Sequence, residues 1–226
     1  MRFVAVCSGA VSEREIVSHL VARHRPAAIV LVGSRADGAA RPGSDWDLYV
    51  LLPPDRGAAP GVTPAPESLG GESLDVGLVG LPIPDGRILP LFGPNLQQAR
   101  VLLDDEQRSA ESLVRRAARL YAAGRGLSPA QRTSREHELA RNLARMRARA
   151  DQPGAFFEAV TFVFYLAHRA WYEVLHDRWS VSVHRALPEI ARADPEFHEC
   201  LVTLMDSREP SARIAAAEAI FARLFR

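Results

Sequence analysis

Two aspartates that stand two residues apart, Asp45 and Asp47, are the residues of this 226-residue sequence best suited to hold a metal ion. They open the apolar run 45–52, which predicts a β-strand. Because side chains alternate along a strand, both carboxylates are expected on one face. Carboxylate oxygens are ligands that Mg²⁺ prefers, and substrate phosphates commonly complete its coordination shell.

A candidate phosphate-binding turn precedes the two aspartates. The apolar run 27–33 predicts a buried strand that ends at Gly33-Ser34. Gly33 would let an anion approach the backbone closely, and Ser34 offers its hydroxyl and its N–H to the same anion. Arg35 and Ser44 complete the predicted nucleotide site. A guanidinium suits triphosphate oxygens, and Arg41, which also flanks the site, is the alternative to Arg35 for this contact. A phosphate-binding turn beside metal-binding carboxylates predicts phosphoryl or nucleotidyl transfer.

Charge and composition exclude several other classes of function. The net charge is +1 and all 28 basic residues are arginines, which excludes lysine nucleophiles, Schiff-base lysines and a Walker-type phosphate loop. A chain so nearly neutral has no sequence-wide basic surface for nucleic acid or anionic membranes. Two cysteines cannot form a cysteine-rich zinc site or a disulfide framework, so the cytoplasm is the expected location. The longest uncharged stretch of the most hydrophobic segment is far too short to span a bilayer.

The elements that must position these residues divide the chain into two parts. Residues 1–100 hold 11 of the 16 prolines and 12 of the 15 glycines, whereas the later residues have helical periodicity. Besides the two strands above, the sequence predicts a strand at 72–80 and an edge strand at 100–104, with a long exposed connection over 53–71. Helices are predicted from a capping box at 12–15 to about residue 25, and over 109–123, 129–150, 154–177, 183–193, 195–206 and 210–225.

The predicted fold class is therefore α+β. A small mixed β-sheet with flanking helices is predicted to form a catalytic domain over residues 1–105. An α-helical bundle follows over 106–226, and we expect it to bind the acceptor, which is the molecule that receives the transferred group.

The string from Gly33-Ser34 to Asp45-Trp46-Asp47 resembles the minimal signature of the DNA polymerase β-like nucleotidyltransferase superfamily, over about residues 15–105. This resemblance implies a third carboxylate on a later strand, for which Asp75 is the candidate and Glu72 the alternative. A turn-rich half followed by a helical bundle further resembles the kanamycin nucleotidyltransferase-like group, whose members adenylylate aminoglycosides and lincosamides. The aromatic run 164–187 looks like part of their C-terminal domains.

The resemblance implies a magnesium-dependent transfer of a nucleoside monophosphate, AMP from ATP, onto a hydroxyl of a small molecule such as an antibiotic, with pyrophosphate leaving. In this scheme Asp45, Asp47 and Asp75 hold the metal, or Asp75 takes the acceptor's proton. The acceptor is expected between the two halves of a monomer or homodimer. Two alternatives stay open, namely an antitoxin-type enzyme that adenylylates a partner toxin, and a non-catalytic nucleotide-binding module.

The candidate acceptor-binding residues lie in the predicted helix 154–177. Their polar-tipped side chains recur at spacings of four, three and four, which predicts a shared helix face: Tyr165, Arg169, Tyr172 and His176. We expect the tyrosines to stack on the acceptor or the base, and Glu173 or His176 to assist proton transfer.

Overall fold

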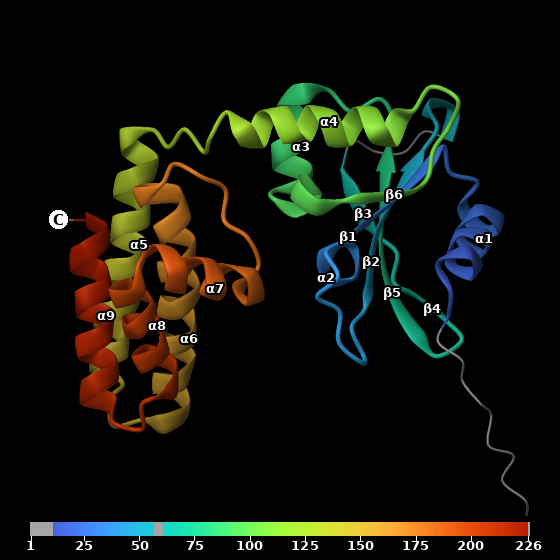
Figure 1. Cartoon of the computed structure of the whole chain (residues 1–226). Coiled ribbons are helices and arrows are strands. Elements are labelled where there is room, and N and C mark those ends of the chain that lie inside the picture. The colour runs from blue at the N-terminus through green and yellow to red at the C-terminus, as the bar shows by residue number, and fades with distance from the viewer. Residues whose placement is uncertain (1–10, 57–60, 226) are drawn as a thin grey trace, which may run out of the picture. The chain divides into compact units, whose positions relative to one another are not determined.

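The computed structural model describes residues 11–56 and 61–225, and Figure 1 shows its elements. The N-terminal part contains a sheet of six strands in the order β3-β5-β2-β1-β6, with β4 also paired to β5. The central strands β1 (Ala28–Val32) and β2 (Trp46–Leu52) are antiparallel, whereas β2 and β5 (Glu72–Gly80) are parallel. The predicted mixed sheet followed by helices is therefore confirmed.

The sheet lies in the middle of the N-terminal part, because its strands direct apolar side chains to both of its faces. All five residues of β1 are buried. In β2 the alternating residues Trp46, Leu48 and Val50 are buried against one face, where helix α1 (Glu13–His24) adds Ile16 and Leu20 to the same core. Alternation leaves the side chains between them for the opposite face.

Helix α1 begins as predicted, with a complete capping box in which Ser12 and Glu15 satisfy each other's backbone N–H groups. The edge strand is confirmed as β6 (Arg100–Leu103), which pairs antiparallel with β1.

The segment predicted as a long exposed connection, 53–71, is partly wrong. It contains β3 (Val62–Pro64) and β4 (Glu67–Leu69), both antiparallel to β5. Three-residue strands are too short to give a periodic signal, and Pro64 argues against a strand except at an edge, which is where β3 lies.

The sequence analysis missed four further elements of this part. They are α2 (Gly33–Ala36), α3 (Asp85–Phe92) and the 3-10 helices η1 (Pro54–Arg56) and η2 (Asn95–Gln98). Phe92 of α3 packs edge-on against Tyr49 with ring centroids 4.7 Å apart, so α3 covers the face of β2 opposite α1.

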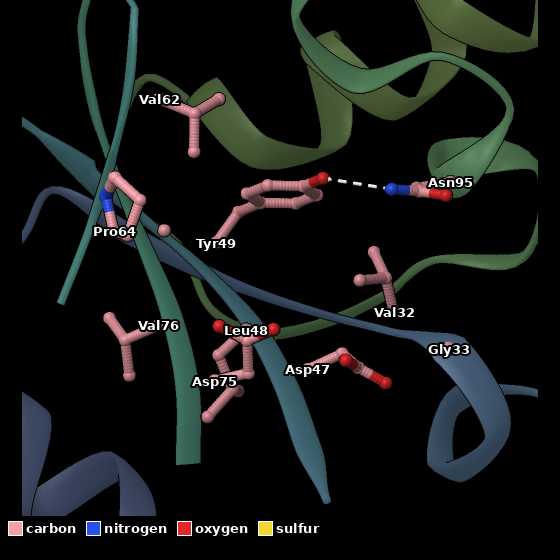
Figure 2. Close-up of a pocket in the computed structure, with 11 residues that line it drawn as sticks. Val32, Gly33, Asp47, Leu48, Tyr49, Val62, Pro64, Asp75, Val76 and Asn95 are labelled. Carbon is pink, nitrogen blue, oxygen red and sulfur yellow. Dashed lines mark hydrogen bonds between the residues drawn. The ribbon is translucent and has the colours of Figure 1, made fainter. Parts of the chain in front are cut away.

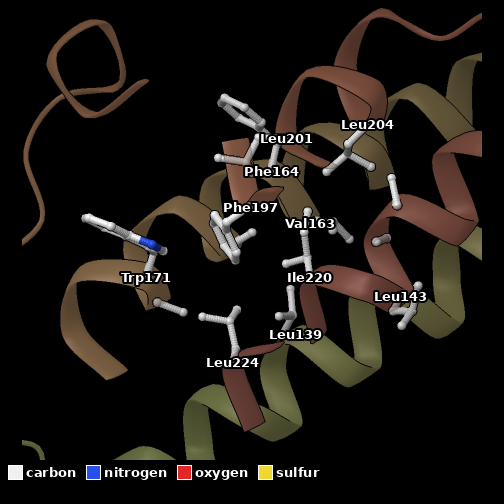
Figure 3. Packing of buried hydrophobic residues seen from close by; sticks show 14 of the residues in the cluster. Leu139, Leu143, Val163, Phe164, Trp171, Phe197, Leu201, Leu204, Ile220 and Leu224 are labelled. Carbon is white, nitrogen blue, oxygen red and sulfur yellow. The ribbon is translucent and has the colours of Figure 1, made fainter. Parts of the chain in front are cut away.

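The C-terminal helices agree closely with prediction. They are α4 (Ser109–Ala122), α5 (Pro129–Ala148), α6 (Pro153–Ala170), α7 (Val183–Ala193), α8 (Pro195–Asp206) and α9 (Pro210–Phe225). The buried side chains of the helices after α4 form one core, part of which Figure 3 shows. The predicted helix 154–177 is interrupted, because α6 passes at Trp171 into a π-helical turn, η3 (Trp171–Leu175).

The chain divides into two compact units between Leu120 and Tyr121, near the end of α4. The domain boundary predicted at 105/106 stays a prediction. No helix within the described residues is long and apolar enough to cross a membrane.

Candidate active site

The candidate active site is a cavity of about 360 Å³ in the N-terminal unit. Asp47 of β2 and Asp75 of β5 are direct neighbours in the parallel register of these strands, and both line the cavity. Figure 2 shows them with the other lining residues, which come from β1, β2, β3, β5 and the first residues of α2 and η2.

Strand alternation explains why the carboxylates reach the cavity. Trp46 and Leu48 are buried in the core beneath the sheet, so Asp47, which lies between them, faces the other way. The same holds for Asp75, between the buried Leu74 and Val76. The apolar periodicity that anchors the two strands therefore fixes the direction of both acids.

Gly33 lies directly against Asp47. Its φ of +69° is in the left-handed region, and a Cβ built on it would overlap the Asp47 carboxylate. We predicted that Gly33 leaves room for an anion at the backbone. In the structure, the anion closest to the Gly33 Cα is the Asp47 side chain itself.

Negative charge accumulates at this site. Burial, with smaller contributions from Asp75 and Asp45, raises the pKa of Asp47 above its ordinary value. A cation would relieve this repulsion, and carboxylates with phosphate oxygens suit Mg²⁺. The donor set therefore fits the predicted ion at Asp47 and Asp75.

Asp45 is placed differently from the other two acids. It is exposed, precedes β2 and is not among the residues that line the cavity, although it is near enough to raise the pKa of Asp47. Within 11–56 and 61–225, no three His, Cys, Asp or Glu side chains converge closely enough to hold a metal ion. The three-carboxylate metal site stays a prediction.

Arg35 and Ser44 have structural partners. The Arg35 guanidinium donates to the Ser44 carbonyl at 2.6 Å and to Glu72 Oε2 at 2.8 Å, and lies 4.2 Å from the centre of the Trp46 ring. The Ser44 hydroxyl accepts the Arg41 N–H at 2.9 Å. Both side chains thus hold the loop between α2 and β2 in place. These contacts within the protein compete with the predicted contact of the same side chains to a triphosphate.

The remaining predicted residue of the phosphate-binding turn, Ser34, is partly exposed in the first turn of α2, next to Gly33.

Tyr49 and Asn95 are cavity residues that the sequence analysis missed. Tyr49 lies two residues after Asp47 on the same strand face, and its hydroxyl accepts a hydrogen bond from Asn95 Nδ2 at 3.0 Å (Figure 2). The spacing from Asp47 was a usable signal for Tyr49. Asn95 had none, because it reaches the cavity from a short helix far along the chain.

The four candidate acceptor residues do not share a surface. Tyr165 is 53% exposed, whereas Tyr172 is fully buried and its hydroxyl donates to Glu189 at 2.8 Å. Arg169 Nε donates a hydrogen bond to the Glu173 carboxylate, and the ring centre of the exposed His176 lies 4.2 Å from that of Trp171. The α-helical spacing that we assumed fails because η3 widens the turn after Ala170 and brings Tyr172 and Glu173 into the interior.

The proposed proton-transfer role of Glu173 is also wrong. Its side chain is 1% exposed. Burial alone would raise the pKa of Glu173, but hydrogen bonds from Arg169 and Arg135 outweigh burial and hold the pKa below its ordinary value. A carboxylate held ionised in this way is a poor proton acceptor.

Comparison with known proteins assigns the N-terminal part of the chain. Residues 13–110 match the family model of the nucleotidyltransferase domain, a segment that contains every residue lining the cavity. This part of the chain is therefore a nucleotidyltransferase domain, which confirms the predicted enzyme class at that level; the kanamycin-type subgroup stays a prediction.

A nucleotidyltransferase-like protein from Exiguobacterium sibiricum 255-15 is similar in structure, with a TM-score of 0.46 and 16% identity. The match covers 93% of this chain and 72% of that one. The sequence matches none of the curated proteins with which it was compared.

Proposed function

We propose that the protein catalyses, at this cavity, the transfer of a nucleoside monophosphate, AMP from ATP, onto a hydroxyl group of a small-molecule acceptor. Pyrophosphate is the leaving group. The observation that carries this proposal is the pairing of Asp47 and Asp75 across β2 and β5, within a segment that matches the nucleotidyltransferase domain. Two facing carboxylates with a raised pKa at one of them are a site built for a cation.

In this proposal Asp47 and Asp75 hold Mg²⁺, with Asp45 joining from the start of β2. The ion would neutralise phosphate charge and so stabilise an in-line displacement at the α-phosphorus. Gly33 and Ser34 face the triphosphate through the backbone and the hydroxyl. Asp75 serves either as a metal ligand or as the base that takes the acceptor's proton, and these two roles stay alternatives.

The Tyr49 ring forms one wall of the cavity above the acids. An aromatic ring with a polar tip can stack on a base or an acceptor ring and still donate a hydrogen bond. We therefore add Tyr49 and Asn95 to the proposed substrate-contacting residues.

The test is a reaction of the full chain with ATP and Mg²⁺ against a panel of hydroxyl-bearing small molecules, with mass spectrometry to detect an added nucleotide. Aminoglycosides and lincosamides head the panel because of the resemblance to the kanamycin-type group. We expect an adduct of 329 Da, the mass that an adenylyl group adds on ~1:1 transfer. The adduct should need both ATP and Mg²⁺ and should disappear in Asp47→Asn.

Two outcomes contradict the proposal. ATP that binds but yields no product with any acceptor would favour a non-catalytic nucleotide-binding module. A nucleotide adduct on a protein partner in place of a small molecule would favour the antitoxin-type enzyme.

A further inference from the structure

The helical unit contains a group of arginines gathered around one buried carboxylate. Glu173 Oε2 accepts from Arg135 Nε at 2.9 Å, and Glu173 Oε1 accepts from Arg169 Nε at 2.9 Å. Arg125 Nε lies 3.5 Å from the same Oε1. Arg132 adds a fourth guanidinium, which donates to the Val174 carbonyl at 3.3 Å. We call these four arginines and Glu173 the arginine cluster.

The charges of the arginine cluster do not balance. Four guanidinium groups lie near three carboxylates, those of Glu173, of Glu138 (3.5 Å from Arg135 Nη1) and of Asp177, which leaves one positive charge in excess. The Asp177 carboxylate lies nearby on the loop, where its Oδ1 accepts the Gly126 N–H. Since Glu173 stays ionised, it holds the arginines in place and neutralises only one of their charges.

The geometry leaves donors available. Glu173 binds Arg135 and Arg169 through Nε, so the two terminal nitrogens of Arg169 have no hydrogen-bond partner among the described residues. Arg125 Nε is buried and forms an ion pair with Glu173 but no hydrogen bond within that part of the chain, while its guanidinium packs 4.5 Å from the centre of the Trp179 ring. Buried polar groups are usually hydrogen-bonded, so a buried donor without a hydrogen bond inside a charged cluster indicates room for a further acceptor.

The cluster is accessible to a ligand. The side chains of Arg125, Arg135 and Arg169 are 19%, 22% and 45% exposed, whereas Glu173 beneath them is 1% exposed. A buried carboxylate that orients partly exposed guanidinium groups is a preorganised arrangement, since the side-chain entropy is lost on folding and not on binding.

We infer that the arginine cluster is a binding site for a phosphate-type oxyanion, in the helical unit and separate from the cavity at Asp47. An oxyanion supplies the negative charge that the arginine cluster lacks, and the planar guanidinium fork matches phosphate oxygens in pairs. The phosphate group can come from the polyphosphate of a nucleotide or from a phosphomonoester. The inference does not rest on the proposed nucleotidyl transfer.

The experiment is a calorimetric titration of the full chain with pyrophosphate, in buffer with EDTA so that no metal-dependent site contributes. Pyrophosphate should bind the wild type, and Arg135→Gln and Arg169→Gln should each raise Kd about tenfold or more, the worth of one charge-assisted hydrogen bond. Arg147→Gln is the matched control, because Arg147 is on the same helix α5 but pairs with Glu218 away from the cluster. It should leave Kd within about twofold, as a surface ion pair contributes little.

Further arms identify the source of the phosphate and guard against misfolding. ATP binding in EDTA supports a nucleotide, and ribose 5-phosphate binding supports a phosphomonoester. Arg169→Lys keeps the charge but loses the fork, and it should fold and still bind more weakly than the wild type. Asp47→Asn should bind pyrophosphate normally, which separates this result from failure of the proposed transfer. Absence of binding in the wild type, or an unchanged Kd in both glutamine variants, overturns the inference.

Discussion

The closest contact in the candidate site joins a glycine to an acid. Asp47 fills the space that any side chain at position 33 would need, so Gly33 is required by the folded protein even before a nucleotide binds. Burial and the neighbouring acids in turn raise the pKa of Asp47. The residues that define the site therefore reduce the stability of the fold, as expected where an ion or substrate supplies the missing charge.

Asp47→Asn should abolish nucleotidyl transfer and at the same time stabilise the metal-free protein at neutral pH. Because the folded pKa is raised, the ionised Asp47 costs stability as the pH rises above the ordinary aspartate value of about 3.9. The melting temperature at pH 7 in EDTA should therefore rise, by about 2–4 °C for each kcal/mol of relief in a chain of this size. The gain should shrink to zero in acid, and a lower melting temperature at pH 7 would contradict the prediction.

Gly33→Ala should cost more stability than Gly38→Ala, although both glycines have left-handed φ angles, +69° and +77°. The strain of a left-handed alanine, about 1–2 kcal/mol, is common to both. Only Gly33 adds an overlap with Asp47, since nothing lies within 4 Å of a Cβ on Gly38. Urea denaturation measures the two costs. Equal costs would mean that Asp47 moves aside freely, and the close packing at the site would then be unimportant.

At the scale of elements, the loop from α2 to β2 is held by Arg35. Its bonds to the Ser44 and Asp45 carbonyls and to Glu72 fix the chain just before Asp47, and its packing on Trp46 links the loop to the core. Arginine forms this set of contacts because its planar fork offers several donors at once. The loop geometry thus depends on a residue that we had assigned to the nucleotide.

The four longer strands, β1, β2, β5 and β6, and most helices could be predicted because each buries an apolar face with a regular period. Asp47 could be identified because it is an acid inside a predicted strand, whereas Asp75 was the candidate for the third carboxylate that the family resemblance implies. Asn95 and β4 could not be predicted, because their positions depend on tertiary pairing that no local pattern records. The π-helical turn at Trp171 interrupts the α-helical period on which the prediction relied. Tyr172 is therefore buried, although the α-helical period predicts it on the same face as the exposed Tyr165.

The same turn predicts very different costs in stability for the truncation of two tyrosines seven residues apart. Tyr172→Ala removes a fully buried ring and its bond to Glu189, and should cost about 3–5 kcal/mol in the free energy of unfolding, as for other large aromatic truncations. Tyr165→Ala removes the same atoms from an exposed position and should cost at most about 0.5 kcal/mol. Urea denaturation of both variants is the measurement. Similar costs would show that the two side chains share one environment, as the α-helical period had indicated.

At the scale of the whole molecule, the two units have separate hydrophobic cores. One core joins α1 to the sheet through residues such as Leu48, and the other joins the helices after α4 through residues such as Leu201. The division falls near the end of α4, so a helix that begins in one unit leads the chain into the other. The cavity and the arginine cluster therefore lie in different units, and each is supported by the hydrophobic core of its own unit.

Matched truncations in the two cores should therefore act on different parts of the chain. Leu48→Ala and Leu201→Ala each remove a leucine that is at most 2% exposed, and each should cost about 2–5 kcal/mol within its own unit. Hydrogen exchange followed by mass spectrometry should show faster exchange in β1, β2 and β5 for Leu48→Ala, and in α6, α8 and α9 for Leu201→Ala. Magnesium-dependent ATP binding, the kind proposed for the cavity at Asp47, should weaken in the first variant alone. Faster exchange throughout the chain in both variants would show that the two units unfold as one cooperative structure.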